Sequence, residues 1–343
     1  MCIRDRITIV GATSGDTGSA AIEACRDRDA VDIFILHPHG RTSDVQRKQM
    51  TTVESSNVHN VAIEGTFDDC QDLVKAMFAH TEFRDSIRLG AVNSINWARV
   101  MAQIVYYVAA ARRLEAKGVE GRVSFAVPTG NFGNVFAGWC ARSMGLEMDR
   151  FIVGSNRNDI LARFFASGEL RTEGVVPSLS PSMDIQVSSN LERLLFELVG
   201  RDGQRIADMM AMFREDGSVA LDPDHFAALG EQWSGTRIDD EGDGGTLDLI
   251  SQVATETGEV LDPHTAVGIG AARALRTGGP VVTLATAHPA KFPDAVEKAT
   301  GSRPQLPERL ADLFEREERY EILPNDLAAV EAHVTSLARI TNP

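Results

Sequence analysis

Short apolar runs alternate with amphipathic segments along the first third of the chain. The apolar runs cover residues 7–10, 32–36 and 60–64. Apolar residues at helical spacing follow each run, at residues 17–26, 43–53 and 67–80. A short apolar run predicts a buried strand, and helical spacing predicts an amphipathic helix. Because strand followed by helix is typical of a parallel sheet covered by helices, the pattern predicts an α/β fold with open parallel sheets.

The second part of the chain continues this order less regularly. A long helix is predicted at residues 97–117, with one apolar face marked by Met101, Ile104, Val105 and Val108. Further strands are predicted at residues 123–127, 151–155 and 281–286, and further helices at 135–144 and 264–276. These elements predict a second α/β region behind the first.

Three stretches of the second part depart from this pattern. Residues 170–190 are rich in Ser and Pro and predict an irregular loop, whereas 190–260 and the residues after 292 predict helices. An acidic loop at 239–245 interrupts the first helical stretch. It lacks the last ligand of a calcium-binding loop because residue 250 is Ile, so we interpret it as a solvated loop.

Length and charge narrow the class of protein. At roughly 150 residues per domain, 343 residues predict about two domains, which we place at residues 1–118 and 119–343. The chain has 34 Lys and Arg against 49 Asp and Glu, a net charge of −15, which argues against binding to nucleic acid or to an anionic membrane. Its four cysteines form no CxxC pair, which favours reduced thiols and a cytoplasmic protein. No Cys and His cluster at metal-ligand spacing occurs, so no metal is expected.

Two glycine-rich segments lie where a predicted strand passes into a predicted helix. The first comprises residues 12–18 and contains Thr13, Ser14, Gly15, Asp16 and Thr17. The second comprises residues 128–134, with the sequence PTGNFGN. Small residues let the backbone approach a ligand, and a helix N-terminus offers free N–H groups to an anion. Each segment therefore predicts an anion cradle, with a plain turn as the alternative.

The details of these two segments leave further alternatives open. In the first, Asp16 or Thr17 could simply cap the following helix. In the second, Phe132 is either a packing anchor or a flank for a flat ligand. Two cradles would give a strongly acidic chain local positive potential without added Lys or Arg. The pair predicts one site for a cofactor phosphate and one for an anionic substrate group.

Two more polar segments follow predicted strands. Asn93, Ser94 and Asn96 precede the long helix, where they could bond a polar ligand or cap the helix. The segment from Thr286 to Phe292 contains His288 and Lys291, each of which could be a site group or a surface residue. Because ligands of open α/β sheets bind beyond the carboxyl ends of strands, all four segments are candidates for one functional region.

The segments TSGDTG, NSINWAR, PTGNFGN and TAHPAKF, in this order, resemble threonine synthase. The resemblance extends from about residue 7 to at least residue 292 and includes residues 64–71. It is specific because four segments match in sequence order. Threonine synthases are fold-type II pyridoxal-phosphate enzymes related to tryptophan synthase β. The resemblance therefore implies that α/β fold and pyridoxal 5′-phosphate as the cofactor.

The resemblance also implies a reaction and residue roles. The family converts O-phospho-L-homoserine and water to L-threonine and phosphate. The smaller domain would carry the substrate loop, formed by Thr13, Ser14, Gly15, Asp16 and Thr17, which takes the carboxylate. The larger domain would hold the cofactor phosphate with Gly130, Asn131, Phe132, Gly133 and Asn134, and the pyridine nitrogen with Thr286. Asn93, Ser94 and Asn96 would line the substrate, with Arg99 a candidate for its phosphate.

One part of the family pattern is missing from this sequence. Family members carry the Schiff-base lysine in an F-K-D-type motif before TSGDTG, and this chain has no such motif. Its lysines are Lys48, Lys75, Lys117, Lys291 and Lys298. We therefore expect an N-terminally truncated threonine synthase that has no catalytic lysine and scarcely turns over.

Two alternatives to this function remain. The chain could catalyse another pyridoxal-phosphate-dependent β-elimination or replacement, as a threonine dehydratase does, because fold does not fix function. It could also be a noncatalytic relative that binds a small anion or a protein partner. The expected partner is a small-molecule substrate, and a monomer and a homodimer remain equally open.

Overall fold

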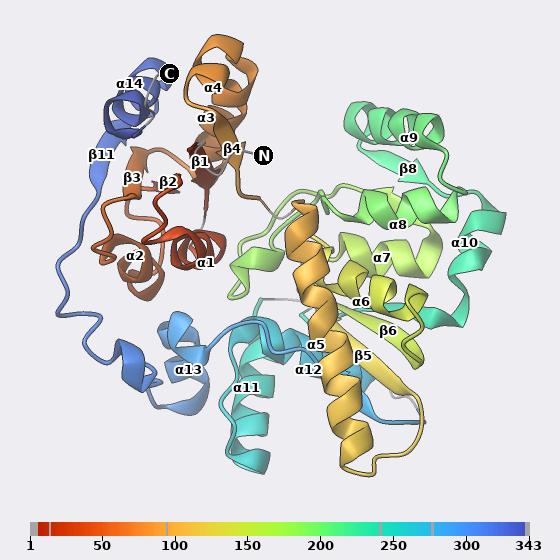
Figure 1. Cartoon of the computed structure of the whole chain (residues 1–343). Coiled ribbons are helices and arrows are strands. Elements are labelled where there is room, and N and C mark those ends of the chain that lie inside the picture. The colour runs from red at the N-terminus through yellow and green to blue at the C-terminus, as the bar shows by residue number, and fades with distance from the viewer. Residues whose placement is uncertain (1–5, 14, 94, 240–241, 276–277, 340–343) are drawn as a thin grey trace. The chain divides into compact units, whose positions relative to one another are not determined.

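The computed structural model describes residues 6–13, 15–93, 95–239, 242–275 and 278–339. The chain divides into two compact units (Figure 1). Unit 1 comprises residues 1–93 and 305–343, and unit 2 comprises residues 94–304. The division differs from the expected boundary at residue 118 in two ways. The long helix belongs entirely to unit 2, and the C-terminal segment returns to unit 1.

Unit 1 contains a parallel sheet of five strands in the order β11-β3-β2-β1-β4. The strands are β1 (Ile7–Ala12), β2 (Val31–Pro38), β3 (Val58–Glu64), β4 (Leu89–Ala91) and β11 (Glu321–Pro324). The helices are α1 (Asp16–Cys25), α2 (Asp44–Thr51), α3 (Phe67–Ala79), α4 (Thr81–Ser86) and α14 (Leu327–Leu337). The three expected strands and three expected helices of this region are present within about three residues of their predicted ends.

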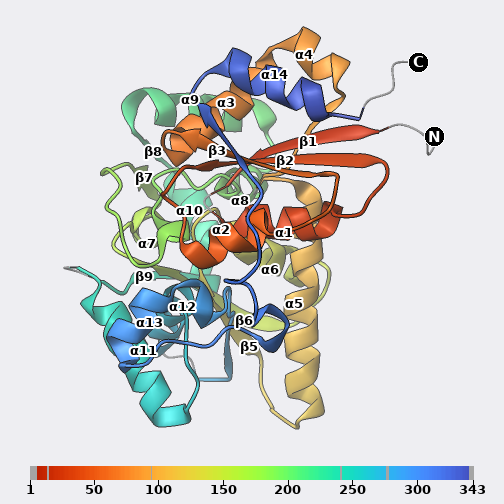
Figure 2. The same cartoon turned by 90° about the vertical axis from the view of Figure 1, so that its left-hand side faces the viewer.

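Helices cover both faces of this sheet. Phe34 and Leu36 of β2 pack with residues of α3 and α14, whereas Ile33 and Ile35 pack with residues of α1 and α2. Figures 1 and 2 show α3 and α14 on one side of the strands and α1 and α2 on the other. Because successive side chains point to opposite faces, a strand buried on both faces is a continuous apolar run, which explains why β2 was predictable.

The C-terminal segment is part of unit 1 through specific contacts. β11 pairs with β3, a strand that the sequence pattern did not predict. The Arg339 guanidinium donates to the fully buried Asp32 carboxylate at 2.6 Å. Arg47 of α2 donates to Glu318 at 2.8 Å, and this ion pair lowers the pKa of the Glu318 carboxyl. The expectation of only helices after residue 292 was therefore wrong.

Unit 2 is built on a parallel sheet of four strands in the order β10-β5-β6-β9. The strands are β5 (Val123–Pro128), β6 (Met148–Ser155), β9 (Trp233–Arg237) and β10 (Val281–Thr283), and a separate antiparallel pair is formed by β7 (Glu169–Arg171) and β8 (Ser218–Ala220). The longer helices are α5 (Trp97–Ala116), α6 (Gly133–Ser143), α9 (Gly203–Asp216), α11 (Gly244–Thr257) and α12 (Pro263–Ala274). The shorter ones are α7 (Ile160–Ser167), α8 (Leu191–Leu198), α10 (Pro223–Leu229) and α13 (Pro293–Thr300). β7, β8 and β9 were not predicted.

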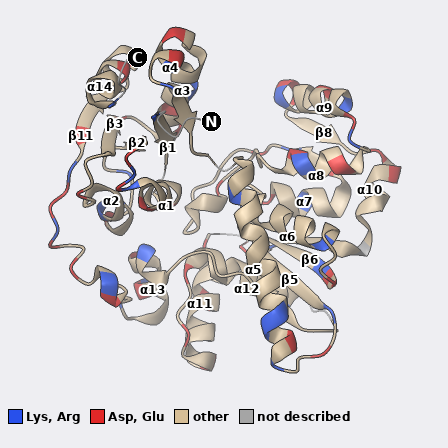
Figure 3. Cartoon of the chain, viewed as in Figure 1, with Lys and Arg blue, Asp and Glu red and all other residues tan. Residues whose placement is uncertain are grey.

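The helix α5 buries a different face from the one that the apolar pattern marked. Met101 and Val105 are 53% and 62% exposed, and Val108 is 38% exposed. Val100 and Tyr107 are buried in the core instead, with Ile104 partly buried beside them. Figure 3 shows charged residues of α5 only near its two ends. The sequence between them, VMAQIVYYVAAA, is almost entirely apolar, so spacing alone could not identify the buried face.

The acidic loop also differs from its prediction. Asp239 is 2% exposed, and its carboxylate accepts hydrogen bonds from Thr246 N at 2.9 Å and from Thr246 Oγ1 at 2.5 Å. Asp243 pairs with Arg157 at 3.3 Å. Asp239 therefore stabilises the start of α11, because a carboxylate near a helix N-terminus meets free N–H groups. Asp243 also accepts from Leu179 N at 3.3 Å and so connects the loop to residues 157 and 179 rather than being solvated. Residues 240 and 241 lie outside the described ranges.

Within the described ranges, no helix combines the length and the apolar character that crossing a membrane requires.

Candidate active site

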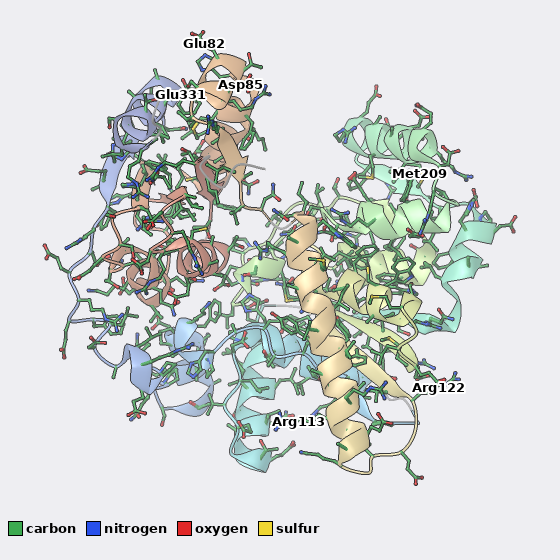
Figure 4. All side chains as sticks on the ribbon, viewed as in Figure 1. Glu82, Asp85, Arg113, Arg122, Met209 and Glu331 are labelled. Atoms are coloured by element: carbon green, nitrogen blue, oxygen red, sulfur yellow. The ribbon has the colours of Figure 1, made fainter. Side chains whose placement is uncertain are left out.

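The strand register of unit 2 brings two of the predicted segments to one edge of the sheet. Thr283 of β10 lies opposite Ala126 of β5 in a parallel pair. Thr286 and Thr129 each lie three residues further along, beyond the carboxyl ends of these neighbouring strands. The opposite edge carries the charges of the α5–β5 connection, where Figure 4 shows Arg113 and Arg122. The candidate site is therefore at the carboxyl edge, where ligands of open α/β sheets bind.

The loop before α6 has the geometry of an anion cradle. α6 begins at Gly133, and no side chain caps its N-terminus. The first-turn N–H groups are thus left for a ligand or solvent. Gly130 lies so close to a neighbouring segment that a Cβ atom there would be 2.3 Å from the carbonyl oxygen of Ser182. The loop needs glycine at this position because the backbone of residues 181–183 occupies the space of a side chain.

Phe132 is a packing anchor. Its side chain is 1% exposed and stacks against Trp233 and Phe165, with ring centroids 5.7 Å and 6.1 Å away. Its backbone adopts the left-handed conformation, with φ 64°. Between the two alternatives for Phe132, the structure favours packing, so this residue can serve a ligand only through its backbone N–H.

The two asparagines of the loop keep their amide NH₂ groups for a ligand. The Oδ1 atom of Asn131 accepts a hydrogen bond from Ser189 Oγ at 3.2 Å. The single hydroxyl proton of Tyr107 is shared between the backbone carbonyl of Asn134, at 2.9 Å, and its Oδ1 atom, at 3.1 Å. Burial raises the pKa of Tyr107 well above its usual value, so this hydroxyl stays protonated and remains a donor. With both amide oxygens engaged, the NH₂ groups of the loop remain available as donors.

A buried carboxylate fixes the position of Thr286. Asp262 is 1% exposed and caps α12, where it accepts hydrogen bonds from the hydroxyl of Thr265 and from its backbone N–H. Thr265 Oγ1 in turn accepts from Thr286 N at 3.2 Å. The backbone of Thr286 is therefore held by α12, while its hydroxyl has no partner among the described residues. Thr286 lies beyond β10, which ends three residues earlier than predicted.

The same carboxylate supports the cradle. His264 Nδ1 lies 3.0 Å from Asp262 Oδ1, and His264 Nε2 accepts a hydrogen bond from Ser182 N at 3.3 Å. This arrangement places the ring proton on Nδ1. The carbonyl of Ser182 lies against Gly130, and Asp262 also holds the backbone of Thr286 through Thr265. Asp262 therefore supports both candidate cofactor-binding positions, Gly130 and Thr286. The sequence predicts only that a helix begins at residue 264, and no local signal reveals this second connection.

The first turn of α5 holds an unpaired cation. Asn96 caps the helix, with its Oδ1 atom accepting from Ala98 N at 2.9 Å. Arg99 is partly buried, its guanidinium forms no ion pair or hydrogen bond within the described residues, and burial lowers its pKa. An arginine without a partner in a partly desolvated position is suited to an anion. Ser94, another predicted site residue, lies outside the described ranges.

The glycine-rich loop of unit 1 leads into α1. Thr13 is 2% exposed, and its hydroxyl accepts from Gly15 N and Gly18 N, both at 2.9 Å. Gly15 itself precedes the helix with φ 136°, so neither predicted capping residue caps α1. Asp16 instead accepts from Gln46 at 3.1 Å. Thr13 thus shapes the loop, and the N-terminus of α1 has no side-chain cap.

Three other candidates complete the predicted set. The hydroxyl of Thr17, at the start of α1, has no hydrogen-bond partner among the described residues, and Asn93 is exposed after β4. Ser14 lies outside the described ranges. His288 accepts from Ala290 N at 3.2 Å, which is the capping contact expected of a loop histidine. Among the described residues, no group of His, Cys, Asp or Glu side chains could hold a metal ion.

These donors fit a cofactor that carries a phosphate and a ring nitrogen. The uncapped start of α6 and the NH₂ groups of the loop provide donors for the phosphate, and the hydroxyl of Thr286 lies at the same sheet edge. Residues 3–230 match the family model described as "Pyridoxal-phosphate dependent enzyme". The fold and the cradle therefore define a pyridoxal-phosphate enzyme of fold type II.

A second family model, "Threonine synthase, C-terminal", matches residues 265–334. The chain belongs to the threonine synthase family, whose members are pyridoxal-phosphate-dependent lyases. The threonine synthase of Pseudomonas aeruginosa is 55% identical over 334 residues, which cover 96% of this chain and 70% of that protein.

Solved structures agree with this assignment. The structure of threonine synthase from Brucella melitensis with bound pyridoxal phosphate has a TM-score of 0.93 at 50% identity, covering 98% of this chain and 72% of that one. The yeast threonine synthase structure has a TM-score of 0.90 at 37% identity, covering 98% and 70% of the two chains. The expected fold class, family and cofactor are thus confirmed.

Proposed function

We propose that the substrate is O-phospho-L-homoserine, which reacts with water to give L-threonine and inorganic phosphate. The observation that carries this proposal is Arg99, a partly buried arginine without an ion pair among the described residues. Burying a guanidinium without a partner is costly, so a dianionic phosphate is the ligand that this position favours most. The cap of α5, Asn96, lies one turn earlier.

The cofactor-binding residues follow from the cradle. Bound pyridoxal phosphate supplies an electron sink for carbanion chemistry. The loop from Gly130 to Asn134 and the first turn of α6 bind its phosphate by backbone N–H and amide NH₂ groups. The hydroxyl of Thr286 bonds the pyridine nitrogen, and the contact with Thr265 orients it.

The substrate carboxylate is assigned to the loop of unit 1. Its donors are the N–H groups at the uncapped start of α1 and the hydroxyl of Thr17. Thr13 acts indirectly, because its hydroxyl already binds two backbone N–H groups of this loop. A Cβ atom at Gly15 would lie 2.7 Å from Gln46 Cβ, so this position of the loop has no room for a side chain. Ser14, Asp16, Asn93 and Ser94 remain further candidates for the polar part of the substrate.

We propose that none of the five lysines of this chain is the catalytic lysine. Lys48 donates to the carbonyls of Phe314 and Arg316, at 3.1 Å and 3.2 Å. Lys75 is exposed and pairs with Asp72. The other three lie at the end of α5, in the HPAKF segment and in α13. Without a lysine that bonds the cofactor covalently, this chain alone is expected to bind it weakly and to be nearly inactive.

Cysteine chemistry supports a cytoplasmic location. Cys25, Cys70 and Cys140 are free thiols, which is typical of a reducing compartment.

The substrate assignment is tested by a binding measurement with a matched control. Titration calorimetry with O-phospho-L-homoserine is carried out on the unsubstituted chain, on Arg99→Gln and on Arg113→Gln. Arg113 is on the same helix, at its other end (Figure 4). A hydrogen bond to a charged group contributes about 1.5–3 kcal/mol, so we expect Arg99→Gln to weaken binding by roughly 10- to 150-fold. The control is expected to bind like the unsubstituted chain, and equal affinities for all three would contradict the assignment.

Turnover separates the alternatives. A longer chain that includes an F-K-D motif should release inorganic phosphate and L-threonine in equal amounts from O-phospho-L-homoserine. Ammonia and a keto acid from serine or threonine would instead indicate a dehydratase. A longer chain that turns over none of these substrates would indicate a noncatalytic relative.

A further inference from the structure

A buried segment of unit 2 connects the two phosphate sites that the proposed function assigns. We propose that Asn190 and Arg193 form a bracket that couples binding of the cofactor phosphate at α6 to binding of the substrate phosphate at α5. This inference rests on the proposed function. It adds two positioning residues that touch neither ligand.

Asn190 holds the cofactor loop from behind. It is fully buried, and both its backbone N–H and its side-chain NH₂ donate to the carbonyl of Asn131, at 3.1 Å and 2.9 Å. Ser188 Oγ donates to the preceding carbonyl, that of Gly130, at 2.7 Å. In a trans peptide the N–H points opposite to the carbonyl. The segment that binds these carbonyls therefore aims the N–H groups of Asn131 and Phe132 to the other side of the loop.

Arg193 extends the bracket to α5. Its Nε atom donates to Asn190 Oδ1 at 3.1 Å, and its Nη2 atom donates to the carbonyl of Ile95 at 2.8 Å. Its guanidinium carbon lies 5.6 Å from the ring centroid of Trp97, a cation–π distance. One planar side chain thus holds the first turn of the helix that carries Arg99.

This geometry makes the two sites depend on each other. The Asn190 amide uses its NH₂ for the cofactor loop and its oxygen for Arg193, so a shift of the loop changes the position available to the guanidinium. The fork of Arg193 passes that change to Ile95. A ligand bound at the cofactor loop therefore orders the first turn of α5, and a ligand bound at α5 orders the cofactor loop. Thermodynamic linkage requires that each ligand change the affinity for the other by the same factor.

The test measures this coupling directly in the full chain. The probe for the cofactor site is pyridoxine 5′-phosphate, which carries the phosphate but has no aldehyde to react with the substrate amine. Its dissociation constant is measured from tryptophan fluorescence, with and without saturating O-phospho-L-homoserine. The ratio of the two constants is the coupling, and we expect at least a threefold tightening in the unsubstituted chain.

Two variants of Arg193 and one control variant test whether the bracket is the source of this coupling. Arg193→Lys keeps the charge and loses the planar fork, and Arg193→Gln loses both. The control is Arg201→Gln, because Arg201 is exposed and, among the residues that the structure describes, its side chain pairs with Glu197 of α8 alone. We expect the ratio to fall to about one in both Arg193 variants and to stay unchanged in the control. A merely structural residue would weaken both dissociation constants together and leave their ratio intact.

The outcomes separate this inference from the proposed function. If the unsubstituted chain binds neither ligand, both are overturned. If it binds both ligands with a ratio of one, or if Arg193→Lys keeps the full ratio, only the bracket is overturned. Thermal unfolding verifies that each variant is folded. If Arg193→Gln does not fold, the ratio measured for Arg193→Lys tests the bracket alone.

Discussion

Replacing Gly130 by alanine tests the cradle where it is tightest. The added Cβ atom would lie 2.3 Å from the carbonyl oxygen of Ser182 and 3.4 Å from Met183 Cα. Ordinary van der Waals contact begins near 3.4 Å, so one of the two backbone segments must move by about 1 Å. Neither segment can yield by a simple side-chain rotation, because the obstructing atoms belong to the backbone.

The expected effects have two parts. Overpacking of this kind costs about 1–3 kcal/mol of unfolding free energy. For a folded unit of this size, that lowers the melting temperature by roughly 2–12 °C. The displaced loop also loses at least one charge-assisted hydrogen bond to the cofactor phosphate, which weakens pyridoxal 5′-phosphate binding by roughly 10- to 150-fold.

The assay combines thermal unfolding with a pyridoxal 5′-phosphate titration. The matched control is Gly203→Ala at the start of α9, where a Cβ atom meets nothing within 4 Å. We expect the control to bind the cofactor normally and to be as stable as the unsubstituted chain or up to about 1 kcal/mol more stable. If Gly130→Ala matches this control in both measurements, the argument that backbone contact requires glycine in the cradle is refuted.

Three further predictions concern buried polar groups. Asp262→Asn is expected to lower the unfolding free energy by about 1–3 kcal/mol in urea titrations and to weaken cofactor binding, whereas Asp222→Asn, at an exposed cap, should cost less and leave binding unchanged. Burial lowers the pKa of His37 to about 4, so between about pH 6.5 and 4 the unfolded chain binds a proton that the folded chain does not. The free energy of unfolding should therefore fall as the pH drops through this range. His37→Phe should flatten this part of the pH profile measured by urea unfolding, and an unchanged slope would contradict the prediction. Burial raises the pKa of Cys70 to about 12, so iodoacetamide at pH 8 should modify the partly exposed Cys25 before Cys70 in peptide mass maps, and labelling of Cys70 before Cys25 would contradict its burial.

Local signals were sufficient for the elements that carry their own pattern. β2 is buried on both faces, and its centre, residues 33–36, is an unbroken apolar run. Ser43 and Thr66 cap the helices that follow β2 and β3, with side chains that accept from Gln46 N and Asp69 N. Helix caps and apolar runs are defined by residues that are close together in the sequence, so both can be recognised from the sequence alone.

Elements that depend on distant partners could not be predicted. β11 is half exposed and forms because it pairs with β3, more than 250 residues earlier. β9 contains Gly235 where a Cβ atom would be 2.8 Å from Ala162 Cα, so close packing rather than an apolar run defines it. Both strands result from tertiary contacts that override local propensity.

The candidate site shows the same division. The glycine-rich loops were predicted because glycines and polar residues follow each strand at fixed positions. The groups that hold the cofactor loop are the buried Asp262 and Asn190 and the backbone of Ser182, and they lie 50 to more than 130 residues away from Gly130 in the sequence. Asp, Ser and Asn are common at helix caps, so only the folded structure shows that these three residues also hold the cofactor loop.

A crystal structure of this chain with pyridoxal 5′-phosphate tests the central claim most directly. The account predicts the phosphate at the start of α6, within hydrogen-bond distance of the backbone N–H groups of the Gly130–Asn134 loop. It also predicts the pyridine nitrogen beside the hydroxyl of Thr286. A cofactor phosphate bound at any other helix or loop, with the α6 cradle holding only solvent, would contradict it.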